Sequence, residues 1–247
     1  NPDGSEAEMC GNGIRCVIRQ AMRHTGKRNF PVKSGEIVFE TNPESDIFPG
    51  IPTFSVKMPV SLDPATLPLL TDKRQIIGEV IPELDDRLHF TAVSLGNPHI
   101  VAAVDAIDPE TLIRLGEKVK HLPIFPKGVN VSLFRKIGEN AIFVSTFERG
   151  AGITFSCGTA MTASSTAATL LGLCDYDRTI DVYNRGGMVR CRCTQETDGL
   201  YTRLTGNATW EYEAEADYDA AGQTIRSVRK TVDYPEERAN YERLKQY

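Results

Sequence analysis

The sequence is short of the features that mark several classes of protein. It has 28 Lys and Arg residues against 33 Asp and Glu, a formal net charge of −5, so it lacks the basic surface that nucleic-acid binding needs. No apolar run approaches membrane-spanning length, and no signal peptide is visible. Histidine is scarce, and no cysteine spacing is typical of a zinc site. We therefore expect no metal, no nucleic-acid or membrane partner, and a cytoplasmic location.

The sequence also lacks an initiator methionine and a disulfide pattern. It opens on Asn1, and we expect it to be part of a longer protein. A chain of 247 residues can bury a sizeable core without cross-links, so its six cysteines are expected to be free thiols. Four of them are interpreted as small apolar side chains: Cys16, Cys174, Cys191 and Cys193.

The other two cysteines lie in two stretches that share one pattern. Each stretch has a turn-rich approach, one cysteine, a glycine, a small polar residue and then a helix-like run. Asn1 lies nine positions before Cys10, and Glu148 lies nine positions before Cys157. We expect these two cysteines to face each other across one site.

A cysteine just before a helix lies where unpaired N–H groups and the helix dipole favour an anion. This position predicts a lowered thiol pKa, and the N–H groups could also bind a carboxylate. One such cysteine would suggest a nucleophile. Two suggest a base and an acid on opposite faces of a substrate, which suits removal and return of the Cα proton of an amino acid. Closure of the site around the substrate is expected.

The hydrophobic periodicity predicts a few helices among many short strands. Apolar residues at helical spacing predict a helix from Gly11 to about His24, ended by Gly26. Asp108-Pro109 predicts another helix start, and the uncharged run 160–171 predicts a helix buried on all sides. The tail from Tyr218 is polar, with a solvent-facing helix opening at Pro235. Strands are expected at 30–32, 36–41, 54–58, 88–95, 100–104, 129–134, 141–147, 178–183, 188–194, 201–205 and 209–215.

These elements predict an α+β fold rather than a doubly wound sheet, because the regular βαβ rhythm is missing. Two analogous halves suggest two pseudo-symmetric domains, mainly antiparallel. The proline-rich stretch 60–70 is interpreted as the connection between them. We place the first domain at residues 1–70 plus about 206–247, and the second at 71–205.

Several blocks of the sequence together resemble the diaminopimelate epimerase family, from Asn1 to roughly Glu215. The blocks are Asp3-Gly-Ser-Glu-Ala-Glu-Met-Cys-Gly-Asn-Gly13 with Arg15-Cys16, Gly96-Asn-Pro-His99, Val129-Asn-Val131 and Glu148-Arg-Gly-Ala-Gly-Ile-Thr-Phe-Ser-Cys-Gly-Thr159. The resemblance implies two similar domains, each with a sheet wrapped around a central helix, the first incomplete at its N-terminus here. It also implies interconversion of LL- and meso-diaminopimelate for lysine and peptidoglycan synthesis, without pyridoxal phosphate or another cofactor.

The resemblance also implies roles for individual residues. Cys10 and Cys157 would be the acid/base pair, with His99 and Glu148 assisting proton movement. Arg149 would pair with the remote carboxylate. The substrate-binding residues implied are Asn1, Gly11, Asn12, Asn97, Asn130, Glu148, Arg149, Gly158 and Thr159.

The sequence departs from the family pattern at three places. Ile153 stands where glutamate is usual, Ala160-Met161 replaces Gly-Ala, and Ile14 replaces alanine. Two alternatives stay open: a related racemase of histidine or a proline-like amino acid, and a non-catalytic redox or binding module with a reversible Cys10–Cys157 disulfide. We expect a small amino-acid substrate, with a homodimer as the candidate assembly.

Overall fold

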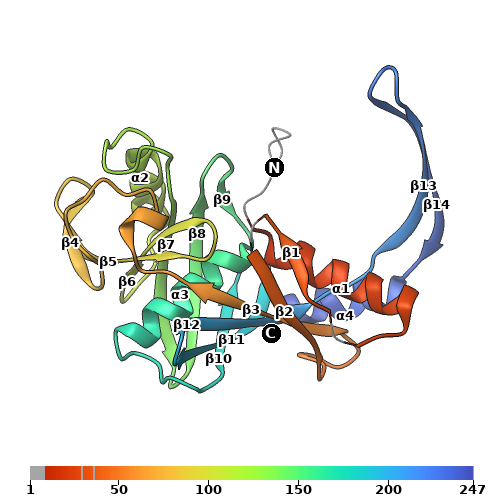
Figure 1. Ribbon diagram of the computed structural model, residues 1–247, viewed down its shortest axis with the longest axis horizontal. Helices are drawn as coiled ribbons and strands as arrows, with labels where there is room; N and C mark the ends of the chain where they lie inside the picture. The colour runs from red at the N-terminus through yellow and green to blue at the C-terminus, as the bar shows by residue number, and fades with distance from the viewer. Residues whose placement is uncertain (1–8, 29, 36, 247) are drawn as a thin grey trace.

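The computed structural model describes residues 9–28, 30–35 and 37–246 (Figure 1). The helices are α1 (Gly11–Thr25), α2 (Pro109–Val119), α3 (Gly158–Leu170) and α4 (Pro235–Lys245), with a short 3-10 helix at Pro64–Thr66. The strands in the first part are β1 (Val32–Ser34), β2 (Ile37–Glu44), β3 (Thr53–Val60), β4 (Glu79–Ile81), β5 (Asp85–Ser94), β6 (Pro98–Ala103) and β7 (Asn130–Gly138). The later strands are β8 (Ala141–Glu148), β9 (Gly152–Thr154), β10 (Ile180–Asn184), β11 (Gly187–Glu196), β12 (Gly199–Asn207), β13 (Tyr212–Asp219) and β14 (Thr224–Asp233).

One large sheet carries most of these strands, in the order β1-β2-β3-β12-β11-β10-β8-β7-β6-β5-β4, with β9 paired to β8. Its pairs are antiparallel except β10 with β8 and β6 with β7. The predicted α+β, mainly antiparallel fold is therefore confirmed. β12 pairs with β3 through eight residues, so the sheet continues across the middle of the chain. The proposed domain limits near residues 70 and 205 stay a prediction.

Helix α3 lies inside the curve of this sheet and contacts β5, β6, β7, β8, β10, β11 and β12. Its residues from Thr159 to Thr169 are all buried, as the uncharged sequence predicted. Small side chains let the strands approach closely, and several of the hydroxyl groups donate to backbone carbonyls one turn earlier in the helix. Thr166, for example, donates to the carbonyl of Thr162 at 2.9 Å. The helix that begins at Cys157 is thus held rigidly from all sides.

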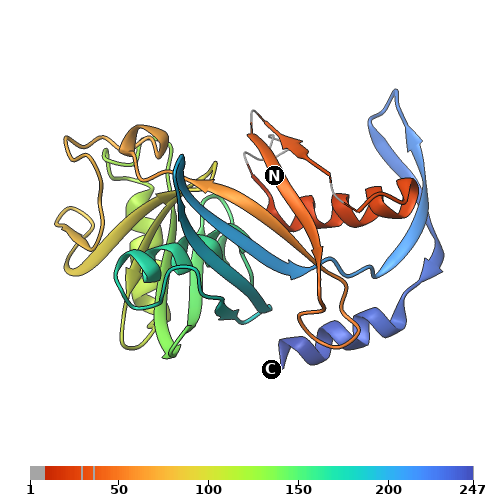
Figure 2. The same ribbon diagram turned by 60° about the horizontal axis from the view of Figure 1, so that its bottom comes forward.

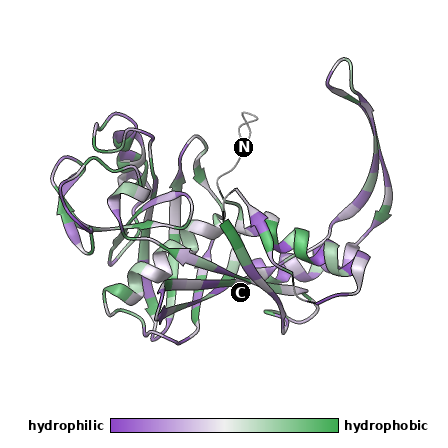
Figure 3. Cartoon of the chain, viewed as in Figure 1, coloured by the Kyte–Doolittle hydropathy of each residue, from purple (hydrophilic) through white to green (hydrophobic). Residues whose placement is uncertain are grey.

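Helix α1 packs against β3 and β12. Ile14 and Ile18 are buried, whereas Val17 is 55% exposed, and Figure 3 shows hydrophilic and hydrophobic residues alternating along the helix. The predicted stop at Gly26 is confirmed, because Gly26 has φ 70° and its N–H donates to the carbonyl of Met22 at 2.9 Å. Helix α2 starts as predicted, with Asp108 accepting from the N–H groups of Glu110 and Thr111.

The sequence prediction for the tail missed one strand. β13 and β14 form a separate hairpin that projects from the molecule, although no strand was expected at Thr224–Asp233 (Figures 1 and 2). Helix α4 begins at Pro235 as predicted and is exposed or half-buried at every residue except Leu244, which is 2% exposed and packs with Ile47, Ile51 and Met188. These apolar contacts of Leu244 come from the loop between β2 and β3 and from β11, which are distant in sequence, so the local polarity of the tail could not reveal them.

Candidate active site

Cys10 is the N-cap of α1 and is exposed. Its Sγ accepts a hydrogen bond from the N–H of Gly13 at 3.4 Å. Beneath it, the buried Arg15 donates from Nη2 to Oδ1 of Asn12 at 3.3 Å and from Nε to the carbonyl of Asn207 at 2.9 Å. Burial lowers the pKa of Arg15, against the opposing influence of nearby thiols. Arg15 therefore fixes the Asn12 side chain beside the cysteine.

Cys157 is the N-cap of α3, and its Sγ lies 3.5 Å from Oγ1 of Thr159. Burial of the thiol, aided by the nearby Glu148 carboxylate, raises the pKa of Cys157 to about 12. The expectation that its helix start lowers the thiol pKa is therefore wrong. The cost of burying a charged thiolate is larger here than the stabilisation that the helix N-terminus offers, so Cys157 is protonated at neutral pH.

The two helix starts converge on one side chain. A Cβ placed on Gly11 would lie 2.9 Å from Cδ2 of Leu204, and a Cβ placed on Gly158 would lie 3.5 Å from the same atom. Because both Cβ positions are measured to the same Leu204 atom, the Cβ positions of Gly11 and Gly158 are no farther apart than the sum of these two distances. On the other side of Cys10, Met9 contacts Gly96, because the Met9 Cβ lies 3.4 Å from a Cβ placed there. Both cysteine stretches therefore belong to one site.

A chain of hydrogen bonds joins the turn before β6 to the start of α3. Asn97 donates from Nδ2 to Oγ1 of Thr159 at 3.2 Å, and His99 donates from Nε2 to Oδ1 of Asn97 at 3.1 Å. His99 is fully buried, and its Nδ1 has no hydrogen-bond partner among the described residues. Burial and the charge of Arg149 lower the pKa of His99 to about 3. A neutral His99 holds Asn97 in place.

A second set of contacts surrounds the end of β8. Asn130 donates to the carbonyl of Pro98 at 3.1 Å and accepts from the N–H of Arg149 at 2.9 Å. Arg149 also donates from Nη1 to the carbonyl of Lys127 at 3.1 Å. Glu148 accepts a hydrogen bond from the hydroxyl of Thr154. Asn130 thus fixes the backbone that carries the two charged residues.

The contacts described above bring together all the predicted site residues that the structure describes. Asn1 lies outside the described residues. Sequence reasoning gave no role to Arg15 or to Thr154, although both lie inside the motifs that carry the family resemblance. Among the described residues, no three His, Cys, Asp or Glu side chains gather where they could hold a metal ion. No described helix is both long and apolar enough to cross a membrane.

Comparison with known proteins gives a consistent result. A diaminopimelate epimerase of Clostridium acetobutylicum is 41% identical over 222 residues, which make up 89% of this chain and 67% of that protein. The chain belongs to the diaminopimelate epimerase family. The family profile for diaminopimelate epimerase matches residues 91–211. A diaminopimelate epimerase of Listeria innocua is 34% identical over 249 residues, covering 99% of this chain and 74% of that protein. The chain thus spans about two thirds to three quarters of these relatives.

Solved structures share the fold of this diaminopimelate epimerase family member at low sequence identity. A phenazine biosynthesis protein of the PhzF family from Bacillus anthracis has 14% identity and a TM-score of 0.56, covering 93% of this chain and 78% of that one. A probable proline racemase from Agrobacterium radiobacter has 16% identity and a TM-score of 0.53, covering 84% of this chain and 67% of that one. These likenesses concern the fold alone. Membership of the diaminopimelate epimerase family identifies the chain as an isomerase of the epimerase class.

Proposed function

We propose that the chain interconverts LL- and meso-diaminopimelate by passing the Cα proton between Cys10 and Cys157. The observation that carries this proposal is the convergence of the two cysteine-capped helices on Leu204. Two thiols that meet from separate elements can act on opposite faces of one carbon atom, which an inversion requires. We further propose that the reaction belongs to lysine and peptidoglycan precursor synthesis in the cytoplasm, and that the protein is a homodimer.

The raised pKa of Cys157 favours this residue as the acid, and Cys10 as the base, in the first transfer. Cys157 keeps its proton, because burial and Glu148 raise its pKa to about 12. Cys10 is exposed, and its sulfur accepts an N–H hydrogen bond, a contact that a thiolate strengthens. The Cys10 thiolate then takes the Cα proton, and the Cys157 thiol donates its own proton to the opposite face. After this step Cys10 is a thiol and Cys157 is a thiolate. When the other stereoisomer binds, the same transfer runs in the opposite direction and returns both cysteines to their starting states.

The developing negative charge on the substrate carboxylate needs donors, and the helix starts supply them. The N–H groups in the first turn of a helix have no partner within that helix, so those at Gly11, Asn12, Gly158 and Thr159 can bind it. Arg149 would pair with the carboxylate at the far end of the substrate. Asn97 and Asn130, already fixed by their hydrogen bonds, would contact the substrate between these ends.

The test is incorporation of deuterium from deuterated water at Cα of diaminopimelate. We expect Cys10→Ala and Cys157→Ala each to abolish inversion, while the matched control Cys16→Ala, also on α1, retains it. Unchanged exchange in either single variant would contradict the two-cysteine mechanism, and absence of exchange in the wild-type protein would support the redox or binding module instead. Strong turnover of histidine or proline with none of diaminopimelate would assign a different racemase to the same site.

A further inference from the structure

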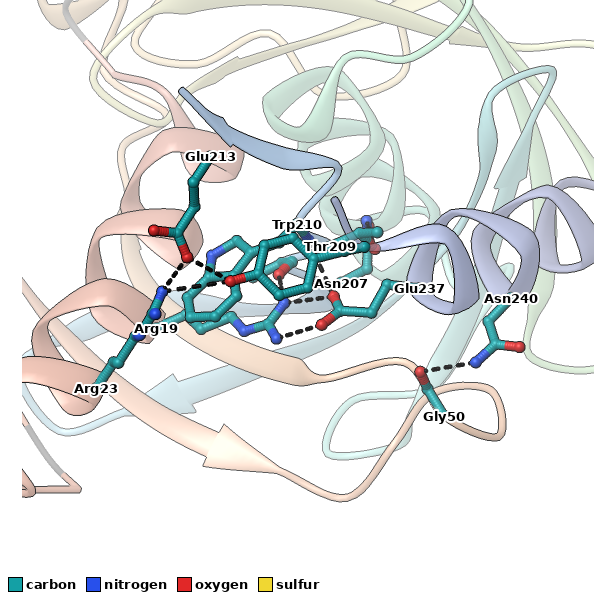
Figure 4. Close-up of polar contacts among 11 residues, drawn as sticks. Arg19, Arg23, Gly50, Asn207, Thr209, Trp210, Glu213, Glu237 and Asn240 are labelled. Atoms are coloured by element: carbon teal, nitrogen blue, oxygen red, sulfur yellow. Dashed lines mark hydrogen bonds and ion pairs between the residues drawn. The ribbon is translucent and has the colours of Figure 1, made fainter. Parts of the chain in front are cut away.

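Helix α4 is attached to the helix that Cys10 caps. Glu237 forms a two-pronged ion pair with Arg19 of α1, with both oxygen–nitrogen distances at 2.6 Å (Figure 4). Glu237 also accepts from the N–H of Trp210 at 3.0 Å, and the Arg19 guanidinium lies 3.8 Å from the Trp210 ring centre. The pair is largely buried, with 13% and 19% of the two side chains exposed. These contacts couple the position of the tail helix to that of α1.

The same helix also reaches the stretch before Cys157. The hydroxyl of Tyr241 donates to the carbonyl of Gly186 at 3.0 Å, in the turn between β10 and β11. The N–H of Gly186 in turn donates to the carbonyl of Phe155 at 2.9 Å. Asn184, in the same turn, donates to the hydroxyl of Ser156 at 3.1 Å. Two successive hydrogen bonds thus connect α4 to the residues that deliver the second cysteine.

The turn and the cysteine stretch are also in tight van der Waals contact. A Cβ on Gly186 would lie 2.8 Å from the Cβ of Ser156, so only glycine fits without a shift. Met161, one of the departures from the family pattern, packs between the two segments, with its sulfur 2.9 Å from Nδ2 of Asn184. A displacement of this turn would therefore be transmitted to Ser156 and Cys157 rather than absorbed.

We propose that α4 is a strap that sets the position of Cys157 relative to Cys10, with Tyr241 as a positioning residue that acts through Gly186. This inference rests on the proposed function, because it gives the spacing between the two thiols its importance. Acid/base transfer through one carbon atom tolerates little displacement, and an error of about 1 Å can cost on the order of a hundredfold in rate. Glu237 holds one end of the strap and Tyr241 holds the other.

The first experiment compares Tyr241→Phe with Asn240→Ala. Tyr241→Phe keeps the packing of the ring and removes only the hydrogen bond to Gly186. Asn240→Ala removes a hydrogen bond from the same helix to the carbonyl of Gly50, which is far from Cys157 along the chain. We expect Tyr241→Phe to lower kcat by about three- to tenfold while KM and the melting temperature stay near wild type. Asn240→Ala should leave kcat unchanged. Equal kcat in Tyr241→Phe and wild type would overturn the proposal.

The second experiment does not depend on turnover. Alkylation of each thiol by iodoacetamide is followed by mass spectrometry, with Cys10 as the internal reference. Loosening of Phe155 and Ser156 should expose Cys157, so its alkylation should be several-fold faster in Tyr241→Phe, with no change in Asn240→Ala. An unchanged Cys157 rate in Tyr241→Phe contradicts the strap. Absence of wild-type epimerase activity would instead contradict the proposed function and leave this measurement valid.

Discussion

Gly11 and Gly158, the first residues of α1 and α3, lie against the same methyl group of Leu204. This relationship joins two motifs that are far apart in the sequence. Both positions lack a side chain where the helices meet the strand β12, which lets the two starts approach each other. The contact is tighter for Gly11 than for Gly158, so the two glycines differ in their tolerance of a methyl group.

The first prediction compares Gly11→Ala with Gly158→Ala. The added methyl at Gly11 would lie 2.9 Å from Leu204 and 3.3 Å from Met58, whereas at Gly158 the 3.5 Å separation is an ordinary contact. Overpacking costs about 1–3 kcal/mol, so we expect Gly11→Ala to lose about that much unfolding free energy and Gly158→Ala to stay near wild type. Urea unfolding of both variants measures this. Equal unfolding free energies of the two variants would contradict this prediction.

The second prediction concerns His99 and the pH dependence of stability. Its folded-state pKa of about 3 lies below its ordinary value of 6.5, so between these values the unfolded chain binds a proton that the folded chain does not. As pH falls through this window, His99 removes about 1.4 kcal/mol of stability per pH unit. His99→Gln should therefore lose less stability than wild type between pH 7 and pH 5.

The measurement is the free energy of unfolding in urea at the two pH values. His24→Gln, which changes an exposed histidine, is the control and should retain the wild-type dependence. The prediction would be wrong if His99→Gln and wild type lost the same free energy on acidification.

The third prediction concerns the thiol of Cys157. Its pKa is raised first by burial and then by the charge of Glu148, so Glu148→Gln should lower that pKa while leaving it above the ordinary value. The pH at which Cys157 becomes reactive toward iodoacetamide should move downward. Cys10 provides the reference within the same sample. An unmoved Cys157 profile would mean that burial alone sets this pKa.

The fourth prediction concerns the attachment of the tail. Lysine cannot reproduce the two-pronged contact of Arg19 with Glu237 or its stacking on Trp210. We expect Arg19→Lys to lose about 1–2 kcal/mol of unfolding free energy. Arg203→Lys, which changes a more exposed pair with Glu40, should lose at most about 0.5 kcal/mol. Trp210 is the single tryptophan, so its fluorescence reports unfolding near the tail.

Local sequence signals were sufficient for the elements that carry the two cysteines. The periodicity of Ile14 and Ile18 predicted α1, Gly26 predicted its end, and the uncharged run after Cys157 predicted a helix buried on all sides. Such signals depend on residues within a few positions of each other, and they suffice where propensity and burial agree. The tail lacked them: β14 is exposed along its whole length, and its pairing with β13 was not readable from an apolar pattern.

The sequence by itself determined the chemistry available here: two matched cysteines, each at a helix start and each followed by glycine. Only the tertiary structure decided that Gly11 and Gly158 meet at Leu204 and that Tyr241 reaches Gly186. It also reversed the expected pKa direction of Cys157. The reason is physical. Helix ends are local and follow from neighbouring residues, whereas desolvation and packing depend on what distant segments place around a group.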